Sequence, residues 1–186
     1  MAGIPDRIHV TGASGSGTTS LGRLIAESYG HRHLDTDDFF WLATDPLYTQ
    51  KRPVVDRLQL LRDALGGADR WILSGSLVDW GDPLIPEFQL VVYVSTPTDV
   101  RLARLRAREA ARYGEDAVAR GGERHEATEA FLAWAGRYDD GGLDVRSRAL
   151  HEAWLTKVMC PVLRVDGTLP LEENVARLGD SHASAV

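Results

Sequence analysis

The feature that most constrains the fold is a glycine-rich turn with the sequence GASGSGTT at residues 12–19. A short, partly apolar run at residues 7–10 precedes this turn, and apolar residues recur behind it at helical spacing as far as about Tyr29. Glycines allow consecutive backbone N–H groups to converge on phosphate oxygens, and a following helix directs the positive end of its dipole at the same point. Strand, turn and helix in this order predict a phosphate-binding loop; a merely flexible glycine-serine loop is the alternative.

The rest of the chain continues the alternation of strand and helix. Further strands are predicted at residues 32–34, 71–73, 90–94 and 162–165, and helices at residues 54–64, 97–112 and 171–178. Parallel strands need crossover connections, which are usually helices that cover the two faces of the sheet. We therefore expect an α/β protein with the three-layer α/β/α fold of P-loop NTPases, built on a five-stranded parallel sheet.

A single domain is expected over residues 1–180, because a chain of 186 residues suits one hydrophobic core. Within it, the glycine pairs at residues 121–122 and 141–142 bracket a mainly polar stretch with its own short helical pattern. This stretch predicts a small helical lid, inserted at approximately residues 113–144. Residues 181–186 are expected to form a frayed tail.

Composition and charge narrow the classes of partner. The net charge of −6 gives no electrostatic footprint for nucleic acid, so no nucleic-acid partner is expected. No apolar run is long enough for a membrane helix, and the amino terminus lacks the pattern of a secretion signal. The only cysteine, Cys160, cannot form an internal disulfide. We expect a cytoplasmic protein without a membrane partner, and its oligomeric state stays open.

The glycine-rich turn departs from the usual P-loop pattern G-x-x-x-x-G-K-[ST] at one position. Gly12, Gly17 and Thr19 are in register, but Thr18 stands where lysine is expected. A threonine offers only a neutral hydroxyl, so another cation must neutralise the transferring phosphate. The residues expected to bind the nucleotide phosphates are Gly12, Gly15, Ser16, Gly17, Thr18 and Thr19.

This lysine-free loop resembles the loop of certain cytidylate-kinase-like proteins, in which threonine also occupies the lysine position. The resemblance implies that catalysis survives the substitution. It also implies that ATP is the phosphoryl donor, that Mg²⁺ is the cofactor, and that the hydroxyl of Thr19 helps to hold this ion.

Acidic residues follow the predicted second strand as Asp35-Thr36-Asp37. This motif resembles the Asp-Thr-Asp of shikimate kinases. The resemblance implies that Asp35 lies near the metal ion and that Asp37 orients the hydroxyl of the acceptor as a catalytic residue. The alternative is an N-cap cluster for a helix that begins near Phe39.

Arginines occur at two places that resemble adenylate kinases. Arg101, Arg104, Arg108 and Arg112 form one stripe on a predicted helix, either as a solvated face paired with Glu109 or as functional groups. The resemblance implies that Arg104 and Arg108 flank the adenine and the phosphates, and that Arg137 and Arg148 are the pair that closes the lid over the triphosphate. It also implies that the loop at Asp166 and Gly167 contacts adenine, where a plain turn is the alternative.

The acceptor is expected beyond the carboxyl ends of the strands. Besides Asp37, the candidate acceptor-binding residues are Trp41, Ser74, Gly75 and Trp80, although aromatic residues more often fill a core than contact a ligand. A phosphate on the acceptor would need a cation, for which the candidates are Lys51, Arg52, Arg57 and Arg62.

Three hypotheses follow for the function. The chain is expected to be a kinase that moves the γ-phosphate of ATP to a small molecule, either a nucleoside monophosphate or a hydroxylated metabolite. The alternatives are a nucleotide-dependent ATPase or switch, and a degenerate nucleotide-binding protein without phosphotransfer. The sequence leaves the acceptor and the base preference open.

Overall fold

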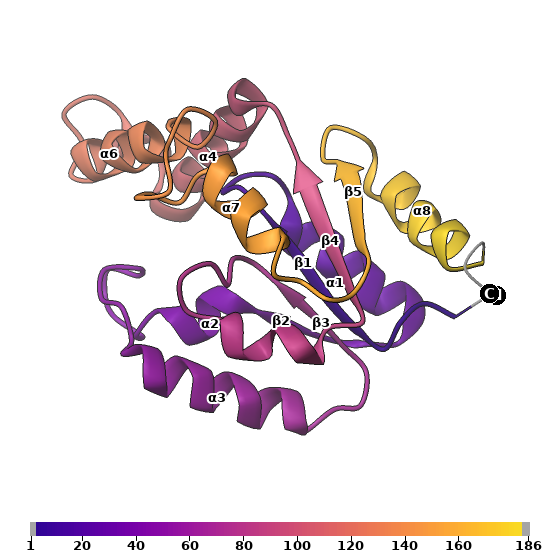
Figure 1. Ribbon diagram of the computed structural model, residues 1–186. Helices are drawn as coiled ribbons and strands as arrows, with labels where there is room; N and C mark the ends of the chain where they lie inside the picture. The colour runs from indigo at the N-terminus through magenta and orange to yellow at the C-terminus, as the bar shows by residue number, and fades with distance from the viewer. Residues whose placement is uncertain (1–2, 184–186) are drawn as a thin grey trace.

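The computed structural model describes residues 3–183 of the chain, with side chains as far as residue 179. Its centre is one parallel sheet with the strand order β2-β3-β1-β4-β5, which confirms the predicted fold class (Figure 1). The strands are β1 (Arg7–Gly12), β2 (Arg32–Asp35), β3 (Trp71–Ser74), β4 (Leu90–Ser95) and β5 (Val162–Asp166).

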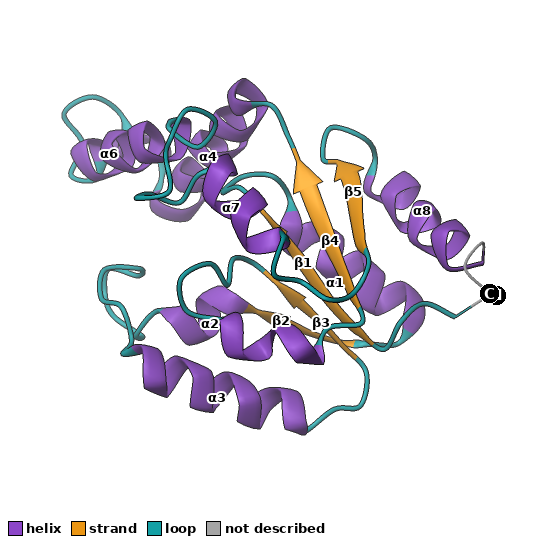
Figure 2. Ribbon diagram, viewed as in Figure 1, coloured by secondary structure: helices purple, strands orange, loops and turns teal. Residues whose placement is uncertain are grey.

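Helices cover both faces of this sheet (Figure 2). The helices of the described residues are α1 (Thr18–Tyr29), α2 (Thr36–Phe40), α3 (Val54–Gly66), the 3₁₀ helix η1 (Asp82–Glu87), α4 (Thr98–Tyr113), α5 (Glu115–Val118), α6 (His125–Gly136), α7 (Arg148–Leu155) and α8 (Leu171–Ala183), and not all of them lie on the sheet. Helix α8 thus includes residues 181–183 of the expected tail, and residues 184–186 lie outside the described part.

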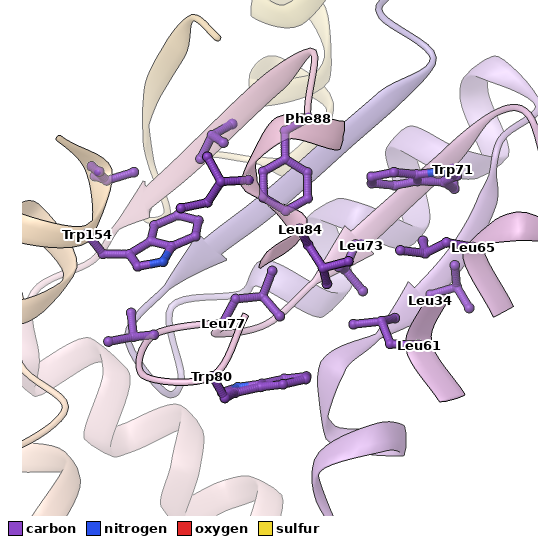
Figure 3. Close-up of a cluster of buried hydrophobic side chains, with 14 of the residues drawn as sticks. Leu34, Leu61, Leu65, Trp71, Leu73, Leu77, Trp80, Leu84, Phe88 and Trp154 are labelled. Atoms are coloured by element: carbon purple, nitrogen blue, oxygen red, sulfur yellow. The ribbon is translucent and has the colours of Figure 1, made fainter. Parts of the chain in front are cut away.

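Two apolar clusters hold the three layers together. On one face, α1 and α8 bury Leu21, Ile25 and Leu178 against strand residues such as Ile8 and Val92. The other face is covered by α3, η1 and α7, whose cluster is drawn in Figure 3. Strand β4 reads Leu-Val-Val-Tyr-Val-Ser, the nearly continuous apolar run expected of a parallel strand that is buried on both faces.

The strand register brings chemically important residues to one edge of the sheet. Val10 of β1 pairs with Ser74 of β3, and Ser74 pairs in turn with Asp35 of β2. Gly12, at the end of β1, pairs with Val94 of β4. The glycine-rich turn therefore begins between the carboxyl ends of two neighbouring strands, where ligands of open α/β sheets bind.

Residues 113–144, the predicted lid, contain α5, α6 and part of the loop that returns to α7. Helix α6 packs on α4 through Leu105, Leu132 and Ala135, and both helices lie beyond the carboxyl ends of the strands (Figure 1). No helix among residues 3–183 is long and apolar enough to cross a membrane.

Candidate active site

The glycine-rich turn closes tightly around the start of α1. Gly17 has a φ of 99° and Gly15 a φ of +81°, in the left-handed region that favours glycine. A Cβ on Gly15 would also lie 2.7 Å from the carbonyl oxygen of Arg101, so the first turn of α4 supports the loop. Phosphate binding at a helix N-terminus requires this close, side-chain-free backbone.

Thr19 and Asp35 meet at the base of the loop. The Thr19 Oγ1 hydroxyl donates to Asp35 Oδ2 at 2.6 Å, and Asp35 Oδ1 accepts the backbone N–H of Asp37 at 3.0 Å. Asp35 therefore caps α2, as the alternative interpretation expected, and its other oxygen faces the P-loop hydroxyl. Two hard oxygen ligands suit Mg²⁺, which keeps several waters and takes its remaining ligands from phosphates.

Asp37 lies in α2 and is a carboxylate among cations. Removal from water and the neighbouring carboxylate of Asp35 raise the pKa of Asp37, whereas Arg146, Arg108 and a hydrogen bond from Trp41 act in the opposite direction. A raised carboxylate pKa brings the group closer to the range in which a general base operates. Of the predicted acceptor-site residues, Asp37 and Trp41 are thus in contact.

Arg146, in the loop before α7, reaches the P-loop. Its Nη2 group donates to Ser14 Oγ at 3.3 Å, and its guanidinium carbon lies 5.6 Å from the centre of the Trp134 ring. The Nε atom is buried without a hydrogen-bond partner, and burial lowers the pKa of Arg146 while Asp37 raises it. The sequence analysis missed this residue, because only its neighbour Arg148 matched the spacing of a known lid pair.

The structure does not bring the two predicted lid arginines to the P-loop. Arg148 forms an ion pair with Asp139, with 2.6 Å between Nη2 and Oδ1, and its side chain is half exposed. Arg137 is exposed at the end of α6. Arg108 lies near the site, where its charge lowers the pKa of Asp37 and its guanidinium carbon is 6.0 Å from the centre of the Phe131 ring.

A cavity of about 460 Å³ opens beside the P-loop. Arg104 borders it and donates to the carbonyl of Gly167 at 3.0 Å and to that of Ser16 at 3.5 Å. The side chain of Asp166 accepts from Thr168 and so shapes the turn. The structure therefore joins Arg104, Gly167 and the P-loop, which the sequence analysis had assigned to nucleotide binding, at one cavity.

The side chains of Ser74 and Trp80 are buried and form hydrogen bonds within the fold. Ser74 is fully buried and hydrogen-bonds to the carbonyl of Thr18 at 3.2 Å and to His33, so it lies beneath α1. Trp80 is buried, and its indole N–H donates to the Ser76 carbonyl. Gly75 has a φ of +113°, and a Cβ there would overlap Thr36 Oγ1, so this glycine lets the turn approach α2.

Arg57 of α3 lies beside α2, the helix that contains Asp37. Its guanidinium carbon lies 3.8 Å from the centre of the Phe40 ring and 5.8 Å from that of Trp80. The Nε group donates to the Arg52 carbonyl, burial lowers its pKa, and no described carboxylate pairs with it. The outer Nη donors of the fork thus have no partner among the described residues.

The chain resembles known proteins in sequence along most of its length. The family AAA_18, an AAA domain, matches residues 8–129. A protein of Bacillus subtilis (strain 168), "Uncharacterized protein YqaC", is 45% identical over 173 residues, which are 93% of this chain and 95% of that protein. A cytidylate kinase of Methanocorpusculum labreanum is 30% identical over 114 residues, 55% of this chain and 63% of that kinase.

The fold is also found among solved structures. A shikimate kinase from Acinetobacter baumannii in complex with shikimate superimposes with a TM-score of 0.54 at 17% identity, and the match covers 97% of this chain and 94% of that one. At this identity the likeness concerns the fold alone.

Proposed function

Because this chain belongs to the AAA_18 family and to the superfamily of P-loop nucleotide and small-molecule kinases, we propose that it transfers the γ-phosphate of ATP to a small anionic acceptor. The observation that carries the proposal is the position of Arg146 between the P-loop and Asp37. The acceptor oxygen attacks the γ-phosphorus, the bond to the β–γ bridging oxygen breaks, and ADP leaves. Where the attacking group is a hydroxyl, Asp37 receives its proton; the phosphate of a nucleoside monophosphate attacks as an anion and releases no proton.

Arg146 supplies the positive charge that Thr18 lacks. Its guanidinium is always protonated and presents donors in a planar fork that suits phosphate oxygens. The contact with Ser14 Oγ supports this role, because Ser14 belongs to the turn expected to hold the phosphates. Arg108, which also acts on Asp37, is proposed as a second cation at the same site.

The nucleotide is proposed to lie with its phosphates on residues 12–19 and its base in the cavity bordered by Arg104 and Gly167. Mg²⁺, when bound, is held by Thr19 and Asp35 and neutralises charge on the phosphates.

Arg57 supports an acceptor that carries a carboxylate or a phosphate. The Nη groups of Arg57 have no counter-ion in the described part of the chain, and a carboxylate or a phosphate can accept two parallel hydrogen bonds from such an open fork. A nucleoside monophosphate and a hydroxylated carboxylic acid both meet this requirement. A neutral sugar does not.

The test is ADP release from ATP, measured with and without a panel of nucleoside monophosphates, hydroxy acids and neutral sugars. Turnover that depends on an anionic acceptor supports the proposal. Turnover without any acceptor would indicate the ATPase alternative, and binding without turnover would indicate a degenerate nucleotide-binding protein. Preference for neutral acceptors would refute the role of Arg57.

The proposed role of Arg146 in phosphoryl transfer is tested by comparing the kcat of Arg146→Ala with that of Arg148→Ala. We expect Arg146→Ala to lower kcat by about 10³-fold, the lower end of what a catalytic arginine contributes to phosphoryl transfer. Thr18→Lys should restore part of this loss in the double variant, because a P-loop lysine brings charge to the same phosphates. A larger loss in Arg148→Ala than in Arg146→Ala would favour the pair predicted from sequence and refute the assignment to Arg146.

A further inference from the structure

Four buried polar side chains beneath the site form a continuous hydrogen-bonded chain. Ser76 Oγ lies 3.1 Å from His151 Nε2, and His151 Nδ1 lies 2.8 Å from the hydroxyl of Tyr138. The Tyr138 hydroxyl is also 2.8 Å from that of Tyr93 in β4. His151 is fully buried, and the other members are at most 8% exposed, so water does not compete for these contacts.

One end of the chain belongs to the turn after β3. Ser76 follows Gly75, which packs on Thr36 of α2, and the Ser76 carbonyl accepts the indole N–H of Trp80. Trp80 in turn contacts Phe40 and Arg57. The position of Ser76 therefore affects the wall on which the acceptor is proposed to bind.

Tyr138, further along the chain, fixes the loop that carries Arg146. Tyr138 is joined to α7 twice: its carbonyl accepts the N–H of Arg148 at 2.7 Å, and its hydroxyl contacts His151. The loop between these anchors is tightened further, because Ser147 donates to the Gly142 carbonyl and caps α7. Arg146 lies within this closed loop, directly before the cap.

Simple core packing does not require this arrangement. Buried polar groups are costly unless they are bonded, and apolar side chains of similar shape would fill the same volume at no such cost. Burial lowers the pKa of His151 to about 3, with the nearby charge of Arg146 adding to the effect. The ring is therefore neutral, carries one proton, and donates to one neighbour while it accepts from the other.

We propose that His151 is a positioning residue that links the turn after β3 at Ser76, which supports Trp80, to the Arg146 loop through Tyr138. This inference rests on the proposed kinase function for its catalytic consequence. The rigid link sets the distance between the acceptor wall and the cation on the P-loop, and a small misplacement of reacting groups lowers the rate of transfer strongly.

The experiment uses the full chain with Tyr138→Phe, which removes one hydroxyl and keeps the ring. Tyr93→Phe is the matched control, since it also removes a buried tyrosine hydroxyl from the chain but leaves the Tyr138–His151–Ser76 link intact. We expect Tyr138→Phe to lower kcat about tenfold, less than the roughly hundredfold cost of a misplacement of about 1 Å, with the Kd for ATP within about twofold of wild type. Tyr93→Phe should lower kcat less than about threefold.

Hydrogen exchange gives a readout that does not depend on activity. In Tyr138→Phe, peptides covering residues 75–80 and 139–147 should lose protection together, whereas Tyr93→Phe should leave both near wild type. Loss in only one segment, or equal loss in the two variants, would overturn the proposal. If wild-type protein phosphorylates no acceptor but the two segments still loosen together, the proposed function fails while the physical link stands.

Discussion

The side chain of Arg101 holds the P-loop and helix α6 together, and its replacement measures that contribution. It is fully buried at the start of α4 and donates to the carbonyls of Thr96, Ser14 and Ala135 and to the hydroxyl of Thr98. Its Nη2 group also lies 3.6 Å from Asp139 Oδ2. A single side chain therefore connects the glycine-rich turn, the end of β4 and the lid helix α6.

Arg101→Met should destabilise the fold by about 3–5 kcal/mol. This is the cost of breaking a buried charged network so that its acceptors are left without donors. The individual hydrogen bonds are not summed, because they share one side chain and are not additive. At about 2–4 °C per kcal/mol for a chain of this size, the melting temperature should fall by about 6–20 °C.

The matched control is Arg106→Met on the same helix. Arg106 forms an ion pair with Glu129 at 2.6 Å, shorter than the one at Arg101, but both side chains are largely exposed. Its removal should cost at most about 1 kcal/mol. Urea unfolding of the two variants, with equal m-values as the check on two-state behaviour, gives both free energies of unfolding. Equal losses in the two variants would refute the conclusion that burial, and not ion-pair distance, decides the contribution of Arg101.

Three further predictions concern the site itself. Asp37→Asn should raise the melting temperature at pH 7. The pKa of Asp37 is raised in the folded state, so ionisation of this carboxyl group destabilises the fold above that pKa. In a series of thermal unfolding experiments, the gain should vanish below about pH 3.8, where the group is protonated in both states. In steady-state assays, Arg57→Met should raise the KM for an anionic acceptor about 10- to 100-fold and leave the KM for ATP unchanged. Arg62→Met, on the exposed face of α3, is the control and should change neither KM. Trp134→Leu should lower kcat about two- to fivefold, since it removes the ring beside Arg146; unchanged kcat would show that this ring does not orient the arginine.

The fold and the P-loop could be predicted from sequence because their signals are local. The turn at residues 12–19 needs glycine at specific backbone positions, and the apolar run of β4 needs burial on both faces. The spacing of Arg101, Arg104 and Arg108 places them on one face of a helix, but it does not predict what each of them contacts. In the structure Arg101 is fully buried, Arg104 contacts Gly167, and Arg108 is exposed near Asp37.

The parts that sequence could not supply depend on contacts across long stretches of chain. Ser74 is the last residue of the buried strand β3, where an acceptor residue is expected, yet its hydroxyl lies beneath α1 because Gly22 leaves room for it there. Arg146 and Arg148 are two residues apart, but their side chains have different partners. Arg146 contacts Ser14, whereas Arg148 forms an ion pair with Asp139. Helix α7 carries no long apolar period, and it is fixed by the Ser147 cap and by the burial of Trp154.

The missing P-loop lysine has a consequence for control of the proposed reaction. A lysine in the turn would be present at the phosphates whenever ATP binds, whereas Arg146 lies outside the turn and reaches it from the loop before α7. Arg108 and Arg146 are each placed beside an aromatic ring of α6, and these rings, Phe131 and Trp134, stack with their centres 5.9 Å apart. In the proposed reaction the stabilising charge would therefore come from two arginines that pack against α6, and not from the nucleotide loop. Any movement that separates α6 from the P-loop withdraws this charge from the γ-phosphate, so bound ATP is expected to be hydrolysed slowly while the lid is open.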